Sequence, residues 1–402
     1  MENPKIRFKG FTKDWEQRKL SDVLDIVTKR NGEKYGKEEV LSVSDEYGCI
    51  NQIKFQGRSF AGEDISNYKI VDTGDIIYTR SPLKSKPYGI IKVVGDEIGI
   101  VSPLYIVNKV KEGNNSQFIY RVFDSPEKTN KYLSPLVRKG AKNTMNISND
   151  EWLSGKIDVA PSYEEQYQIG LYFDHLDHFI TLHQRKCDET KRLKKYMLQK
   201  MFPQNGEKVP EIRFSGFTDD WEQRKVCNIT TSYSGGTPKS GYTEYYDGDI
   251  PFIRSGEIYS DKTELFITEL GMKNSSAKMV HEGDILYALY GATSGEVSRA
   301  KLDGAINQAI LAIVPNDDIN ANFLVEWFRK EKDKITDTYL QGGQGNLSAQ
   351  IIKELEVTIP SYDEQNKIGL YFEQLNTLIT LHQRELENLQ NIKKFMLEKM
   401  FV

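Results

Sequence analysis

The sequence contains an internal repeat of two blocks, and this repeat limits what the chain can fold into. Residues 5–20 and residues 211–226 are identical at 12 of 16 positions. Residues 161–202 and residues 360–401 are identical at 24 of 42 positions. A solenoid would need more copies of a shorter unit. The 402 residues are therefore best described as two half-chains of roughly 200 residues, each framed by the same two blocks.

The repeated blocks enclose two cores that resemble each other much less. Residues 22–160 and residues 227–359 share only fragments, such as VDTGDIIY and VHEGDILY. Short β-branched runs alternate with Gly, Pro and Asn turns in both cores, which is typical of strands joined by tight turns. We predict strands at residues 75–80, 88–94, 103–110, 250–256, 284–290 and 305–314, and helices near residues 116–123 and 322–334. Each core is then a mixed α/β domain.

The second block of each half has the apolar spacing of one long helix. Proline precedes the block, and Ser162 with Glu165 forms a capping-box pattern. The pattern predicts about 38 residues of helix, or roughly 57 Å. Because such a helix is unstable alone, we expect the two copies to pair antiparallel as a coiled coil. The predicted seam comprises Ile169, Phe173, Leu176, Ile180, His183, Ile368, Phe372, Leu375, Ile379, His382 and Leu386.

Polar residues also fall on this seam. His183 and His382 occupy equivalent positions, as do Lys194 and Lys393. We interpret them as residues that set the helix register or contact a partner protein, in preference to a catalytic role.

The predicted fold class is α+β, with two mixed α/β domains joined by two long antiparallel helices in a pseudo-twofold repeat. The predicted boundaries are residues 1–160 for the first domain, 161–202 for the central helix, 203–359 for a linker with the second domain, and 360–402 for the C-terminal helix.

Sequence motifs that carry catalysis are missing. There is no Walker A motif, no G-x-G-x-x-G loop, no HExxH and no pair of cysteines with metal-ligand spacing. The Asn/Asp-Pro-Pro-aromatic tetrapeptide of amino-methyltransferases is also absent. We therefore expect a non-catalytic chain with no bound metal or cofactor. Three scattered cysteines, no signal-peptide pattern and no long apolar run favour a reducing, cytoplasmic setting.

The first core carries acid-free basic loops despite the net charge of −4. Residues 78–92 hold four cations, and residues 128–149 hold five. Cations interleaved with Asn and Thr are suited to contacting phosphates and base edges, although a solvated basic face would have the same composition. The candidate DNA contacts here are Arg80, Lys84, Lys86, Arg138, Lys139, Lys142, Asn143 and Thr144.

The second core is acidic, with a net charge of −7 over residues 227–359. Its candidates are polar, glycine-rich loops, where the backbone can approach a ligand closely. Ordinary turn chemistry explains each of these loops equally well. The candidate contacts are Thr237, Lys239, Ser240, Arg254, Thr293, Ser294, Gln344 and Asn346.

Taken together, these motifs resemble the specificity subunit of type I restriction–modification enzymes. The resemblance rests on RFKGFTKDWEQRKL and RFSGFTDDWEQRKV before the cores, on IPFIRSGEI and GDI-x-Y inside them, and on IPSYDEQ-x-x-IGLYF at the second long helix. It covers essentially the whole chain. The acidic second core is a departure that puts a direct electrostatic grip by that half in doubt.

The resemblance implies separate roles for the cores and the long helices. Each core would read one half of a split sequence in double-stranded DNA, and the helices would fix the gap between the half-sites. A length of roughly 57 Å corresponds to at most about 17 base pairs. The frames would dock two methyltransferase subunits, which bring S-adenosylmethionine, and restriction subunits would join them.

Two other interpretations stay open at this point. A duplicated coiled-coil scaffold would have the same repeat without any DNA specificity. A self-contained DNA-modifying enzyme would need the catalytic motifs that the sequence lacks.

Overall fold

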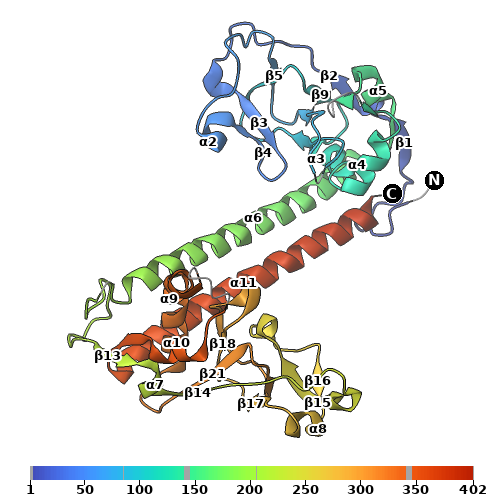
Figure 1. The fold of residues 1–402 in the computed structure, drawn as a ribbon. Helices are drawn as coiled ribbons and strands as arrows, with labels where there is room; N and C mark the ends of the chain where they lie inside the picture. The colour runs from blue at the N-terminus through green and yellow to red at the C-terminus, as the bar shows by residue number, and fades with distance from the viewer. Residues whose placement is uncertain (1–2, 85, 140–144, 205, 341–345, 402) are drawn as a thin grey trace. The chain divides into compact units, whose positions relative to one another are not determined.

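The computed structural model describes residues 3–84, 86–139, 145–204, 206–340 and 346–401. The chain forms two compact units (Figure 1). Unit 1 is Met1–Gln184 together with Arg384–Val402, and unit 2 is Arg185–Gln383. Each unit therefore contains one core, the beginning of one long helix and the end of the other.

The core of unit 1 is a run of short strands with short helices between them, and the label η marks a 3-10 helix. In chain order its elements are β1 (Glu16–Lys19), α1 (Leu20–Val23), β2 (Leu24–Ile26), η1 (Lys37–Glu39), β3 (Leu41–Ser44), β4 (Gly48–Asn51), α2 (Gln52–Gln56), β5 (Lys69–Val71), β6 (Ile76–Tyr78), β7 (Ile91–Val93), β8 (Gly99–Val101), β9 (Ile106–Val110), α3 (Ser116–Val122), α4 (Pro126–Leu133), β10 (Arg138–Lys139), β11 (Met145–Asn146), α5 (Asn149–Ser154) and β12 (Lys156–Val159).

The core of unit 2 follows the same plan with one longer helix. Its elements are β13 (Glu222–Lys225), α7 (Val226–Ile229), β14 (Thr230–Ser234), η3 (Thr243–Tyr245), β15 (Tyr246–Ile253), η4 (Ser255–Glu257), β16 (Phe266–Ile267), α8 (Glu269–Lys273), β17 (Lys278–Val280), β18 (Ile285–Ala288), η5 (Gly291–Thr293), β19 (Val297–Arg299), β20 (Gly304–Ile306), β21 (Ile310–Pro315), α9 (Ala321–Leu340), α10 (Ala349–Glu354) and β22 (Glu356–Ile359).

The two cores share the strand order of one four-stranded sheet. The four-stranded sheet β2-β9-β6-β7 of unit 1 corresponds to β14-β21-β18-β19 of unit 2. In register, Tyr78 lies opposite Ile106 in unit 1, and Tyr287 lies opposite Leu311 in unit 2. Both tyrosines are fully buried, which explains why GDI-x-Y recurs in cores that otherwise differ.

Most of the predicted core elements are confirmed. Strands β6, β7, β9, β15 and β18 and helices α3 and α9 fall within or across their predicted ranges. The single strand predicted at residues 305–314 is wrong, because Asn307 to Ala309 turn the chain. The residues on either side are β20 and β21, which belong to different sheets. An apolar run does not by itself reveal such a break, since both flanking strands are buried.

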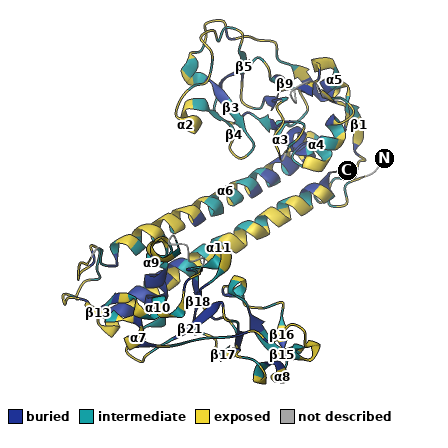
Figure 2. Ribbon diagram, in the orientation of Figure 1, coloured by how far each residue is buried: buried dark blue, intermediate teal, exposed yellow. Residues whose placement is uncertain are grey.

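The two long helices are confirmed. Helix α6 (Tyr163–Lys200) has 38 residues and α11 (Tyr362–Met400) has 39. Their buried residues gather where the helices meet a core, and much of the remaining surface is exposed (Figure 2).

The helices pair antiparallel within each unit. In unit 1, the rings of Phe173 and Phe401 lie 6.0 Å apart, and Asp177 lies 2.7 Å from Lys393. Residues further along α6 therefore contact residues that come earlier in the α11 region, as expected for antiparallel helices. Unit 2 repeats this order, with Phe202 beside Phe372 and Lys194 beside Asn376.

The predicted seam residues differ in burial along the helices. The positions nearest the cores are buried: Ile169, Phe173, Leu176, Ile368, Phe372 and Leu375. The later positions are half-buried: Ile180, His183, Ile379, His382 and Leu386.

In each unit, the first repeated block packs against the start of a long helix. Trp15 and Trp221 are buried in the two main hydrophobic clusters, beside Phe401 and Phe202 respectively. Glu165, which we expected to cap α6, is instead fully buried and accepts hydrogen bonds from the guanidinium of Arg7. No helix among the described residues is long and apolar enough to cross a membrane.

Candidate nucleic-acid interface

The loop that follows β6 in unit 1 carries three of the predicted DNA contacts. Lys84 is exposed. Lys86 forms an ion pair with Asp45, whose Oδ1 lies 2.9 Å from its Nζ. Lys84 is therefore the better candidate for a phosphate contact in this loop.

Arg80 has a different role from the one that its charge indicates. Its φ of 53° lies in the left-handed region, which is unfavourable for a side chain with a Cβ. Nε donates to the carbonyl oxygen of Leu104 at 2.7 Å, and Nη1 donates to that of Ile147 at 3.2 Å. Burial lowers the pKa of the guanidinium. Arg80 therefore joins three loops through backbone carbonyls.

Arg138 lies beside Arg80 on a shared hollow of about 260 Å³. Its side chain is 83% exposed, and Nη2 lies 2.8 Å from Oε1 of Glu151. The hollow is also lined by Met145, Asn146, Ile147 and Ser148. The structure thus brings together two predicted contacts from distant parts of the sequence. Arg80 is bound to backbone carbonyls, whereas Arg138 is largely exposed in a surface ion pair with Glu151.

Several predicted contacts fall on residues that the structure does not describe. Lys142, Asn143, Thr144 and Gln344 lie outside the described residues, and so does the side chain of Lys139.

Polar loops of unit 2 hold the remaining candidates. Thr237 Oγ1 donates to Oε1 of Gln308 at 2.6 Å, which fixes an exposed amide beside the loop. Lys239, Ser240 and Asn346 are exposed. Ser294 donates to the carbonyl of Gly291 at 2.9 Å, in a turn where Thr293 is half-buried.

Two features of this surface were not predicted from the sequence. The rings of Tyr242 and Tyr245 stack 5.0 Å apart at an interplanar angle of 17°, close to Lys239 in sequence. Gln308 was missed because it lies in the turn that the prediction treated as strand. No sequence signal distinguishes it, since the runs on both sides are apolar.

Arg254 is held by acids of its own domain. It lies 2.8 Å from both Glu257 and Glu264. These contacts raise the pKa of Arg254. Burial alone would raise the pKa of Glu257, but Arg254 and two backbone N–H groups lower it to about 2. This geometry favours a structural role for Arg254 over a base contact.

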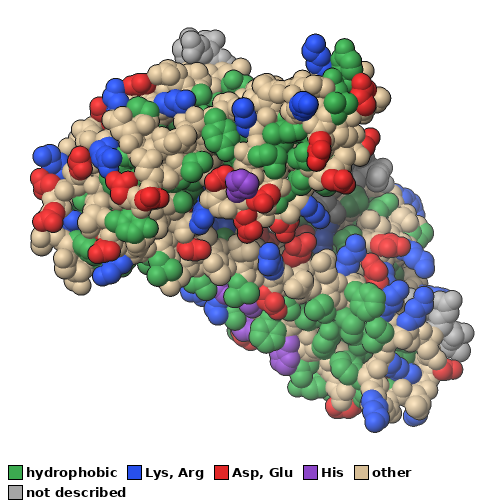
Figure 3. Space-filling model, turned by 90° about the horizontal axis from the view of Figure 1, so that it is seen from below, with side chains coloured by type: hydrophobic (Ala, Val, Ile, Leu, Met, Phe, Trp, Pro, Cys, Tyr) green, Lys and Arg blue, Asp and Glu red, His purple; other side chains and the backbone are tan. Residues whose placement is uncertain are grey.

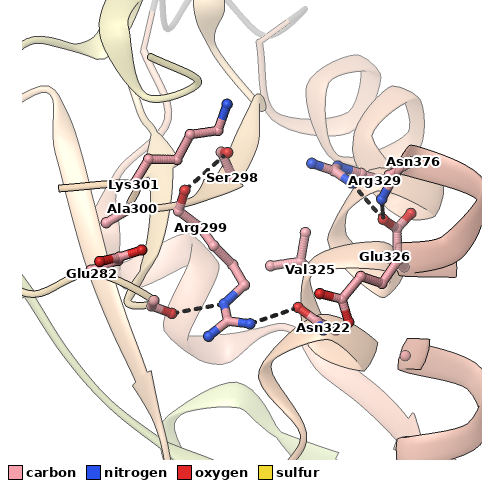
Figure 4. Close-up of a pocket in the computed structure, with 13 residues that line it drawn as sticks. Glu282, Ser298, Arg299, Ala300, Lys301, Asn322, Val325, Glu326, Arg329 and Asn376 are labelled. Atoms are coloured by element: carbon pink, nitrogen blue, oxygen red, sulfur yellow. Dashed lines mark hydrogen bonds and ion pairs between the residues drawn. The ribbon is translucent and has the colours of Figure 1, made fainter. Parts of the chain in front are cut away.

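A hollow of about 560 Å³ lies in unit 2 between β19, α9 and the start of α11 (Figure 4). Arg299 crosses it, donating to the carbonyl of Gly283 and to Oδ1 of Asn322, both at 3.0 Å. Three cations (Arg299, Lys301 and Arg329) are matched by three acids (Glu282, Glu326 and Glu373). Its charge therefore does not favour an anion.

One face of the molecule shows how charged and apolar side chains are distributed on it (Figure 3). On the face drawn in Figure 3, basic and acidic side chains are interspersed, and hydrophobic side chains reach the surface in several places. No group of His, Cys, Asp and Glu within the described residues could hold a metal ion.

Both long helices expose apolar side chains at equivalent positions. The pairs are Tyr163 with Tyr362, Leu171 with Leu370, Phe179 with Leu378, Leu193 with Ile392, and Tyr196 with Phe395. Where exposed apolar side chains form a contiguous patch, they can mark a surface that another protein covers.

Comparison with known proteins identifies the class. Residues 12–192 and residues 218–391 match the family described as the type I restriction modification DNA specificity domain, so the chain belongs to this family. It is a type I specificity subunit with two target recognition domains.

Individual relatives resemble the chain over different lengths. It is 22% identical to the MjaX specificity subunit of Methanocaldococcus jannaschii, over 95% of this chain and 91% of the relative. It is 30% identical to the MjaIX specificity subunit of the same organism, over 46% of this chain and 44% of the relative.

Solved structures share its fold. The chain is similar to the S subunit of a type I restriction–modification system from M. genitalium, with a TM-score of 0.69, 14% identity, and coverage of 100% of this chain and 99% of that chain. A structure that describes complex assembly and conformational transition of the type I R-M system matches with a TM-score of 0.51, 16% identity, and coverage of 98% and 99%.

Proposed function

We propose that each unit reads one half of a bipartite target in double-stranded DNA. The observation that carries this proposal is that two equivalent frameworks present different side chains from equivalent loops. The loop after β6 offers Lys84, whereas the loop after the equivalent strand β18 offers Thr293 and Ser294. A shared scaffold with divergent loops suits two separate base sequences.

The two halves would use different contacts. Unit 1 offers exposed cations such as Lys84 and Arg138, which suit phosphates or guanine edges. Unit 2 offers a fixed amide at Gln308 and the tyrosine stack, with little positive charge. Its phosphate neutralisation would then depend more on partner subunits.

The experiment is to co-express the chain with its methyltransferase and map methylated bases across a genome. Lys84→Gln and Arg80→Gly in unit 1 should weaken or relax one half-site and leave the other unchanged. Thr237→Val should change only the other half-site. A change in both half-sites from either substitution would contradict the division between units. Methylation without any sequence preference in the unsubstituted chain would instead favour the scaffold interpretation.

We also propose that the exposed apolar positions of α6 and α11 dock two methyltransferase subunits. Equivalent positions on the two helices would bind two copies of one partner. That partner would carry S-adenosylmethionine and the catalytic groups, and restriction subunits would join the assembly. Leu171→Asp and Leu370→Asp should each reduce the bound methyltransferase, as measured by mass of the purified complex. Lys191→Asp, at an exposed position without an apolar side chain, is the control.

The spacing of the half-sites would follow the helix lengths. Inserting one heptad after Gln184 and another after Gln383 places both insertions at the limits of the compact units. Seven residues add about 10 Å, or roughly three base pairs of gap. An unchanged gap in the methylated target would refute the idea that the helices act as a ruler.

A further inference from the structure

A cluster of charges lies where α3 packs against the beginning of α6 in unit 1. The side chain of Arg121 is only 2% exposed. Its guanidinium reaches Asp174 at 2.7 Å and Asp177 at 2.6 Å on α6. Lys393, from the end of α11, lies 2.7 Å from Asp177 and 2.8 Å from Asp124. Burial alone would raise the pKa of Asp124, but Lys393 and Arg121 hold it well below its ordinary value.

Unit 2 has a cluster at the equivalent place with reversed charge. The side chain of Glu326 is 3% exposed, and its carboxylate lies 3.0 Å from Nζ of Lys194. Nδ2 of Asn376 donates to the same carboxylate at 3.0 Å, and Arg329 completes the cluster. Lys194 also donates to Oδ1 of Asn376 at 2.7 Å.

The two clusters can be matched residue by residue. Asn115 and Asn320 each cap the helix that follows, and each donates its backbone N–H to the equivalent glutamine of a long helix. From these caps the sequence is in register, without a gap, to the charged positions. The equivalent residues are Arg121 and Glu326, Asp124 and Arg329, Asp174 and Glu373, Asp177 and Asn376, and Lys393 and Lys194.

The charges at the core positions are thus inverted between the units: Arg121 corresponds to Glu326, and Asp124 corresponds to Arg329. The residue that meets them at the start of the long helix also differs, being Asp177 on α6 and Asn376 on α11. Asp177 pairs with two cations in unit 1. In unit 2, Asn376 instead donates a hydrogen bond to the carboxylate of Glu326. The end of the other long helix contributes the same residue type to both clusters, Lys393 in unit 1 and Lys194 in unit 2.

We propose that residues 177 and 376 make each long helix specific for its own core. The face of α6 accepts a core with a buried cation, and the face of α11 accepts a core with a buried carboxylate. With the second core on α6, the buried Glu326 would face the half-buried Asp177, and two carboxylates would meet. With the first core on α11, Arg121 would lose a carboxylate that holds it in unit 1. The shared frame therefore does not make the two cores interchangeable.

A neighbouring position on the sheet follows the same pattern. Strand pairing aligns Lys92 of β7 with Ser298 of β19. Lys92 donates to the hydroxyl of Tyr120, which in turn donates to Asp124. In unit 2 a lysine at Ser298 would approach Arg329, and the small serine leaves the hollow of Figure 4 open.

The test places the residue of one helix into the other, in the full chain. Asn376→Asp should speed backbone hydrogen exchange in α9 by about tenfold or more, with α3 of unit 1 unchanged. Gln374→His is the matched control. Gln374 is exposed, and the substitution likewise introduces the residue found at the equivalent position of α6, His175.

Recovery is the decisive result. The triple variant Glu326→Arg, Arg329→Asp and Asn376→Asp recreates the charges of unit 1, and it should exchange more slowly in α9 than Asn376→Asp alone. Unchanged exchange in the single variant, or no recovery in the triple variant, would overturn the proposal.

The reciprocal test is in unit 1, where Asp177→Asn should speed exchange in α3. It stands independently if the triple variant fails to fold, and unchanged exchange there would also overturn the proposal. None of these measurements requires DNA or a partner subunit, so they are separate from the proposed function.

Discussion

Arg7 and Glu165 join the first repeated block to the start of α6 by two parallel hydrogen bonds. Nε lies 2.5 Å from Oε1 and Nη2 lies 2.8 Å from Oε2. Arg213 and Glu364 repeat this fork at 2.7 Å and 2.8 Å. Both glutamates are fully buried. The paired hydrogen bonds explain why the arginine of RF in one block and the glutamate of E-Q in the other recur together.

Replacing Arg7 by Gln should destabilise unit 1 alone. The substitution leaves Glu165 buried without its cation, and breaking such a pair costs about 3–5 kcal/mol. Hydrogen exchange in the first turns of α6 measures the loss, with Lys9→Gln as an exposed control. Arg213→Gln should affect the first turns of α11 in the same way. Equal exchange in the Arg7 and Lys9 variants would show that the buried pair does not hold α6.

Close helix contacts require glycine at Gly170 and Gly369. A Cβ at Gly170 would lie 2.8 Å from Cβ of Gln117, and one at Gly369 would lie 2.6 Å from Oδ1 of Asn320. Substituting Ala at either glycine should therefore cost about 1–3 kcal/mol through overpacking. Urea unfolding followed by exchange in α3 or α9 locates the effect. Gly62→Ala, where a Cβ meets nothing within 4 Å, should be nearly neutral.

Asp75 predicts a pH dependence of stability in unit 1. Burial raises its pKa to about 6, despite the opposing hydrogen bond from the backbone N–H of Asp72. A pKa raised on folding means that the folded state favours the protonated carboxyl. Its contribution is complete below about pH 4 and is lost as pH rises through 6.

The variant Asp75→Asn removes this titration and keeps an oxygen that can accept from Asp72. It should match the wild type near pH 4 and exceed its stability above pH 6. Denaturant midpoints across this range measure the difference, with exposed Asp96→Asn as a control. A constant difference between Asp75→Asn and the wild type at all pH values would contradict this account.

Sequence alone predicts the parts of this fold that depend on local periodicity. The long helices follow from apolar spacing, and the buried Tyr78 and Tyr287 follow from a motif that survives in both cores. The turn at Asn307 to Ala309 could not be predicted, because buried strands on both sides leave no alternation. Glu165 was assigned to a cap because a local pattern says nothing about Arg7, which is distant in sequence.

The candidate interface was less predictable for a similar reason. A cation in a polar loop has the same sequence signature whether it meets solvent or an internal partner. Arg80 is bound to backbone carbonyls, and Arg254 is bound to Glu257 and Glu264, yet Arg138 is largely exposed. Only the folded arrangement separates these cases. The charge inversion between Arg121 and Glu326 likewise becomes meaningful only when the opposing helix is known.

Arg138 and Arg254 should therefore respond differently to substitution. Arg138→Gln should weaken DNA binding by the assembled complex and reduce the slope of log affinity against log salt by about 1, if it contacts a phosphate. Arg254→Gln should leave this slope unchanged and lower the stability of unit 2 instead. The two slopes are compared by titrating the same target DNA at several salt concentrations.

The stability difference caused by Arg254→Gln should depend on pH with a defined sign. Glu257 has a folded-state pKa of about 2, below its ordinary value of 4.5. Its stabilising contribution is therefore present above about pH 4.5 and is lost as pH falls toward 2. In the variant, the pKa of Glu257 should return toward 4.5. The gap in denaturant midpoint between wild type and variant should then be largest at pH 7 and shrink by pH 3. A gap that stays constant over this range would mean that Arg254 supports unit 2 through packing and not through its charge.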